Sequence, residues 1–114
     1  MTVNKKIENA LSNLVDGNIW PDAVPKENST TEWITYVAPK TPVEYGDDED
    51  RSWVAMVNVH YVHKGRVNYL KTEKEIRSRL RKAGFSLLYS DGFYDDDLAS
   101  SHVIINANVV EDGD

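Results

Sequence analysis

The longest strand signal in the chain is SWVAMVNVHYVH, which occupies residues 52–63. One set of alternate positions is apolar or aromatic throughout: Trp53, Ala55, Val57, Val59 and Tyr61. The other set becomes polar in its middle, at Asn58 and His60. Because successive side chains of a strand point to opposite faces, this alternation predicts a strand with one fully buried face and one partly covered face.

Three more strands are predicted on either side of this stretch. Residues 33–38 are rich in β-branched and aromatic side chains, which favour strands. Residues 85–90 and 101–110 carry apolar side chains at alternate positions. Asp91-Gly92 is a turn signal typical of a hairpin, so we expect a turn there, directly after the strand at 85–90.

Two amphipathic helices are predicted, at residues 3–16 and 67–83, because apolar side chains recur there along one helical stripe. Gly17 and Gly84 stand where glycine commonly ends a helix. The resulting order is helix, strand, strand, helix, strand, strand. It predicts an α+β fold with an antiparallel or mixed sheet of about four strands and both helices packed on one face. A chain of 114 residues has the length of one domain, expected to span residues 1–114.

Composition narrows the function classes. The formal net charge is −6 and the sequence pI is about 5.0, whereas a general nucleic-acid binder needs a basic excess to displace counterions from phosphates. There is no cysteine, which excludes disulfides and thiol catalysis. No apolar run approaches the roughly 18 residues of a membrane span, and the N-terminus leads to no continuous apolar segment of a signal peptide. We therefore expect a cytoplasmic protein without a membrane partner.

The sequence contains no catalytic signature. A Gly-x-Ser-x-Gly elbow, a phosphate loop and a dinucleotide fingerprint are all missing, and the carboxylate clusters fall in predicted loops or at the terminus. We therefore expect no enzyme and no cofactor. His60 and His102 approach each other if their strands pair, but neither they nor His63 has a third ligand at metal-site spacing. The aspartates after Gly92 lack the ligand pattern of a calcium loop, so we expect no metal site.

Charged and aromatic side chains outside the predicted core are candidates for protein contacts. A basic face on the second helix, which includes Lys74, Arg77 and Arg81, either faces solvent, meets phosphate or meets the acidic loops of a neighbouring copy. Tryptophan and tyrosine are enriched at interface hot spots. The aromatic candidates for a subunit or partner interface are Trp20, Tyr36, Tyr45 and Tyr94.

The order of these pieces resembles the tail terminator, or tail-to-head joining, family of long-tailed bacteriophages. An N-terminal amphipathic helix is followed by Ile19-Trp20-Pro21-Asp22 and then by the strand Trp33-Ile34-Thr35-Tyr36. A long strand follows with Val57-Asn58-Val59-His60-Tyr61. A helix that ends in Leu80-Arg81-Lys82-Ala83-Gly84-Phe85 leads to the last two strands, so the resemblance covers nearly the whole chain.

The resemblance implies a virion tail protein that is assembled in the bacterial host cytoplasm and is not an enzyme. Members of that family form rings, often hexameric, that join the tail tube protein to a head-completion protein while DNA passes through. In such a ring, acidic loops would line a lumen that does not retain DNA. The residues that would supply it are Asp47, Asp48, Glu49, Asp50, Asp95, Asp96 and Asp97. Two alternatives remain: another minor tail or head-completion protein, and a small protein-binding adaptor domain of non-viral function.

Overall fold

The two longest strands form the centre of the sheet. The computed structural model describes residues 2–26, 28–43 and 52–112, and in it β4 (Ser52–Lys64) pairs antiparallel with β6 (Ser100–Asp112) along their whole length. On the far side of β4 lie β2 (Glu32–Val37) and then β1 (Ile19–Pro21), and on the far side of β6 lies β5 (Ser86–Asp95). The order across the sheet is therefore β1-β2-β4-β6-β5.

The predicted α+β class is confirmed, and the sheet is mixed because β1 runs parallel to β2 while the other pairs are antiparallel. Two short strands raise the number of strands in the sheet from the predicted four to six. The first is β1, and the second is β3 (Lys40–Val43), which continues the β2 position along the edge of β4. Pro42 hides β3 from a sequence pattern, but proline is tolerated on an edge strand that pairs on one side only.

The turn predicted at Asp91-Gly92 is wrong, because both residues lie inside β5. The chain turns instead at residues 96–99, and β5 carries a bulge between Leu87 and Tyr89. Gly92 stands where the second helix passes close to the sheet. A Cβ atom at Gly92 would lie 2.7 Å from Cδ2 of Tyr69. The glycine therefore permits close packing of the helix rather than a reversal of the chain.

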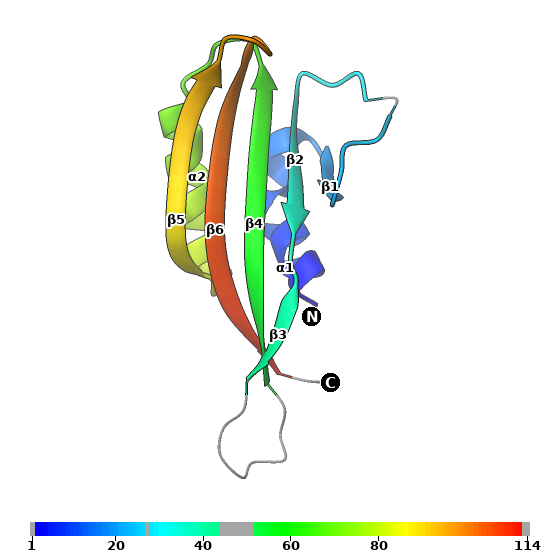
Figure 1. Cartoon of the computed structure of the whole chain (residues 1–114), viewed down its shortest axis with the longest axis vertical. Helices are drawn as coiled ribbons and strands as arrows, with labels where there is room; N and C mark the ends of the chain where they lie inside the picture. The colour runs from blue at the N-terminus through cyan, green and yellow to red at the C-terminus, as the bar shows by residue number, and fades with distance from the viewer. Residues whose placement is uncertain (1, 27, 44–51, 113–114) are drawn as a thin grey trace.

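The helices start and stop near the expected positions. The first consists of α1 (Val3–Leu11) and a 3-10 turn at Ser12–Val15, and its N-cap Thr2 accepts a hydrogen bond from the backbone N–H of Lys5. The second, α2 (Tyr69–Lys82), is capped in the same way by Asn68. Figure 1 shows both helices on the same side of the sheet, with α2 behind β5 and β6.

One face of the sheet and the two helices enclose the core. Alternate residues of β4 and β6 face each other across the ladder, and two of these core pairs, Val57 with Ala107 and Ala55 with Val109, match a larger side chain with alanine. Both helices contribute one buried stripe, made of Val3, Ile7, Leu11 and Val15 from the first and Ile76 and Leu80 from α2. The other face of the sheet is not covered by either helix (Figure 1).

Candidate interaction surfaces

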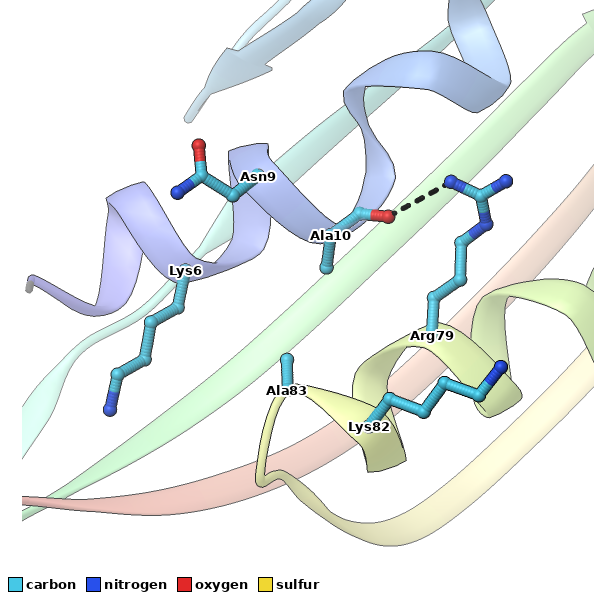
Figure 2. Close-up of a pocket in the computed structure, with 6 residues that line it drawn as sticks. All are labelled: Lys6, Asn9, Ala10, Arg79, Lys82 and Ala83. Carbon is cyan, nitrogen blue, oxygen red and sulfur yellow. Dashed lines mark hydrogen bonds between the residues drawn. The ribbon is translucent and has the colours of Figure 1, made fainter.

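A groove of about 590 Å³ runs between the two helices on the outside of the helical layer. Its lining residues form the α1–α2 groove: Lys6, Asn9, Ala10, Arg79, Lys82 and Ala83. Figure 2 shows the methyl groups of Ala10 and Ala83 pointing toward each other across the gap, with the cationic side chains around them. The small side chains leave an apolar floor, and three cations surround it, with no acidic side chain among the described residues that line it.

Arg79 fixes the spacing of this groove. Its Nη1 donates a hydrogen bond to the carbonyl oxygen of Ala10 at 3.2 Å, which joins α2 to the end of α1 (Figure 2). Its Nε lies 3.0 Å from Oε1 of Glu75 one turn earlier, so part of its charge is balanced locally. Within the described part of the chain, Lys6 and Lys82 form no ion pair, and they carry the remaining positive charge of the groove.

The basic face predicted on α2 lies on a different side of the helix from the groove. Lys74 and Arg81 are exposed, whereas Arg77 is held by the sheet. Its Nη1 donates to Oγ of Ser90 on β5 at 2.5 Å, and the same hydroxyl donates to Glu73 at 2.6 Å. Arg77 therefore contributes to docking α2 on β5, and the structure does not present these three cations as one continuous free surface.

The last residue of β5 and the turn after it form the acidic turn, residues 95–98, in which residues 96–98 are exposed and which is held in shape by its own hydrogen bonds. Oδ1 of Asp95 accepts hydrogen bonds from the backbone N–H groups of Asp97 at 3.0 Å and Leu98 at 3.2 Å. Among the described residues, Asp96 forms only a long, exposed ion pair with Arg66, at 3.8 Å. Leu98 is 68% exposed although it is apolar. The turn thus presents an apolar side chain next to carboxylates.

The predicted aromatic anchors differ in their burial and their contacts. Tyr36 is 2% exposed and belongs to the core, where its hydroxyl donates to the carboxylate of Glu8, so the structure does not support it as an exposed anchor. Burial, together with Glu8, raises the pKa of Tyr36. Tyr94 is half-buried beneath the guanidinium of Arg66, which lies 3.9 Å from its ring centre. Trp20 is half-buried on the edge strand β1.

Some predicted residues lie outside the described residues. They are Tyr45 and the acidic stretch Asp47, Asp48, Glu49 and Asp50. Of the acidic lumen predicted from the sequence, the structure therefore describes only Asp95, Asp96 and Asp97.

A chain of polar side chains crosses the open face of the sheet. Nε2 of His60 lies 2.9 Å from Nδ1 of His102, and Nε2 of His102 lies 2.7 Å from Oγ of Ser100. The ring of Phe93 stacks on His102 with centroids 5.0 Å apart. His60, Ser100 and His102 themselves line a cavity of about 380 Å³, together with apolar side chains that include Trp33, Val62 and Leu98. The expected approach of His60 and His102 is therefore observed, whereas His63 bonds the backbone carbonyl of Lys64.

Burial, and next the neighbouring His102, lower the pKa of His60, which favours a neutral ring at this site. A hydroxyl beside an imidazole is the pairing that activates serine nucleophiles. Ser100 lines the cavity, but it is only 4% exposed and its hydroxyl is already bonded to His102. The arrangement fits an internal hydrogen-bond chain that orients two rings on the sheet.

Neither a metal cluster nor a membrane helix is found in residues 2–26, 28–43 and 52–112. No three histidine, aspartate or glutamate side chains gather there closely enough to hold an ion. No helix of this part combines the length and the hydropathy needed to cross a bilayer.

Comparison with known proteins gives a fold match without a sequence match. No family model matches the sequence, and no curated protein matches it either. The fold is similar to that of a chain in a solved structure described as the virion of a native gene transfer agent particle. The TM-score is 0.67 at 12% sequence identity, over 97% of this chain and 95% of that chain. At this identity, the similarity concerns the fold.

The sequence does not predict the α1–α2 groove. Its residues come from two segments far apart in the chain, with Lys6 and Ala10 on one helix and Arg79 and Ala83 on the other. One signal was present: Ala10 and Ala83 lie on the helical stripes that face inward, where small side chains leave space. Which helix sides face each other is fixed only by the docking of both helices on the sheet.

Proposed function

We propose that this chain is a ring-forming structural subunit of a phage-like particle, a tail terminator or head–tail joining protein that acts through protein contacts. The observation that carries the proposal is the fold similarity to a chain of a gene transfer agent virion over nearly the full length of both chains. The fold similarity supports the family resemblance described from the sequence, because one comparison uses the three-dimensional fold and the other uses the order of sequence motifs. The tail tube protein and a head-completion protein are the proposed partners.

The surfaces support an assembling protein better than a catalyst. An apolar groove ringed by cations and an exposed acidic turn lie on different parts of the chain. A head-to-tail ring needs two unlike surfaces that match each other. His60, His102 and the buried Ser100 form a hydrogen-bond chain, and among the described residues no acidic side chain is bonded to it to complete a hydrolytic triad.

The oligomeric state of the purified chain tests this proposal. Light scattering after gel filtration is expected to give a discrete multiple of the 12.9 kDa chain mass, and electron microscopy of the same fraction is expected to show closed, hexameric rings. A chain that stays monomeric at every concentration, alone and in the presence of assembled tail tubes, would contradict the proposal. A monomer that binds a cellular protein instead would favour the adaptor alternative.

A further inference from the structure

We propose that the acidic turn of one copy docks into the α1–α2 groove of the next copy, with Leu98 on the alanine floor and the aspartates against the cations. This inference rests on the proposed ring function, and it names the two surfaces that would join the subunits. It commits the groove to one occupant, a second copy of this chain.

The first argument is that the turn and the groove match each other in apolar surface and in charge. Leu98 is a large apolar side chain left 68% exposed, and Ala10 and Ala83 offer an apolar floor with room above it. Asp96 and Asp97 directly precede Leu98, while Lys6 and Lys82 lie beside the floor. The charges would select the partner and fix its register, and the leucine would supply the buried contact.

The second argument is preorganisation of the turn. The carboxylate of Asp95 accepts two backbone hydrogen bonds within the turn, and Ala99 has a φ of 49° that reverses the chain before β6. A turn already held in shape loses little conformational freedom when it binds. Of its contacts with the described part of the chain, Asp96 has only the long, exposed ion pair with Arg66 to give up.

The third argument is that the contact cannot form within one copy. The turn lies at the end of the sheet where α2 begins, since Arg66 contacts both Asp96 and Tyr94 there. The groove lies at the other end of α2, whose 14 residues span about 21 Å at 1.5 Å per residue. Figure 1 shows the β5–β6 turn at the top of the sheet and the end of α2 well below it. The contact must therefore join different copies head to tail. The proposed contact also places Asp95–Asp97 at the subunit interface instead of in the lumen.

Lys6 shows that helix stability alone does not explain the cations of the groove. Basic residues such as Arg79 and Lys82 favour the last turn of a helix because they complement its dipole, so their presence alone does not indicate a partner. Lys6 lies in the first half of α1, where the dipole disfavours a cation. Lys6→Glu is therefore expected to leave the fold intact and to reverse the charge on the groove. Lys5→Glu, on the adjacent exposed position outside the groove, is the matched control.

The experiment uses two full-length variants, each with one surface removed. The groove variant is Lys6→Glu, and the turn variant combines Asp97→Asn with Leu98→Ser. Sedimentation velocity is measured for each alone and for their mixture, at 50 and 500 mM salt. Each variant alone is expected to stay monomeric, because it lacks one half of the contact. The mixture is expected to form a complex of twice 12.9 kDa and nothing larger, since one intact groove meets one intact turn. The complex is expected to weaken at the higher salt.

The controls and the wild-type chain separate the two proposals. Lys5→Glu and Leu88→Ser, an exposed leucine at the bulge of β5, are expected to assemble like the wild type. If the wild type forms rings while the variants also form rings, or their mixture gives no complex, the docking is wrong and the ring function stands. If the mixture forms the binary complex while the wild type forms only open chains, the docking stands and the closed ring fails. A wild type that stays monomeric both alone and with assembled tail tubes, together with an inert mixture, overturns both.

Discussion

Gly92 is the position where a single added carbon tests how α2 packs on the sheet. In Gly92→Ala the new Cβ would lie 2.7 Å from Cδ2 and 3.3 Å from Cε2 of Tyr69. Non-bonded carbons prefer separations of about 3.5–4.0 Å, so the ring or the backbone must shift by nearly 1 Å. Overpacking of this kind costs about 1–3 kcal/mol. Alanine recovers about 0.4–1 kcal/mol by restricting the unfolded chain. We therefore predict a net loss of about 1–2 kcal/mol in the free energy of unfolding.

A double-mutant cycle with Tyr69→Ala isolates this contact. Urea unfolding followed by circular dichroism gives the free energy of unfolding of the wild type, both single variants and the double variant. Without the Tyr69 ring, the closest remaining contact of the new Cβ is Oε1 of Glu73 at 3.4 Å, which is ordinary van der Waals distance. In that background, Gly92→Ala is expected to be neutral or slightly stabilising. An equal loss in both backgrounds would refute the reasoning, because the penalty would then come from β5 itself.

Two further predictions concern the core and the histidine pair. Leu80→Ala removes a fully buried side chain of α2 and is expected to lower the free energy of unfolding by about 2–5 kcal/mol. Leu70→Ala, at a site 60% exposed, is expected to change it by less than about 0.5 kcal/mol. Comparable urea midpoints for the two variants would contradict the assigned packing. Because burial and His102 lower the pKa of His60 below its ordinary 6.5, the unfolded chain binds more protons, and stability is expected to fall as the pH drops through 6.5 toward the folded-state pKa. His60→Gln is expected to flatten this part of a pH series of melting temperatures, and an unchanged slope would assign the pH dependence to other groups.

The sequence predicts the elements whose periodicity reports directly on burial. The alternation in β4 and β6 and the helical stripes of α1 and α2 each reflect a single buried face, so they locate the core before any contact is known. The predictions that are wrong concern positions where tertiary packing outweighs the local preference of the residues. Asp91-Gly92 has the composition of a hairpin turn, yet Gly92 serves the approach of Tyr69. Pro42 suggests a break, yet an unpaired strand edge accepts it.

The candidate surfaces were less predictable than the fold, because charge patterns do not say what lies opposite. The spacing of Lys74, Arg77 and Arg81 places them on one side of α2, but the sequence does not reveal that Arg77 would bond Ser90. Tyr36 was predicted to lie outside the core as a candidate interface residue, whereas its strand register turns it into the core. A surface made by two segments requires the docking geometry of both, which no local pattern contains.

The open face of the sheet is the other surface able to receive a partner, and its composition explains why we do not assign the subunit contact to it. Met56 and Val110 are exposed there, but the bonded pair Asn58 and Asn106, 2.6 Å apart, lies on the same face. A face of this kind offers apolar area without charges that select one register, so a partner strand or sheet would be free to slide along it. The turn and the groove each combine an apolar contact with charge of opposite sign, and that combination fixes both position and direction. A closed ring requires every subunit to repeat the same rotation, so the contact that fixes direction is the one able to close it.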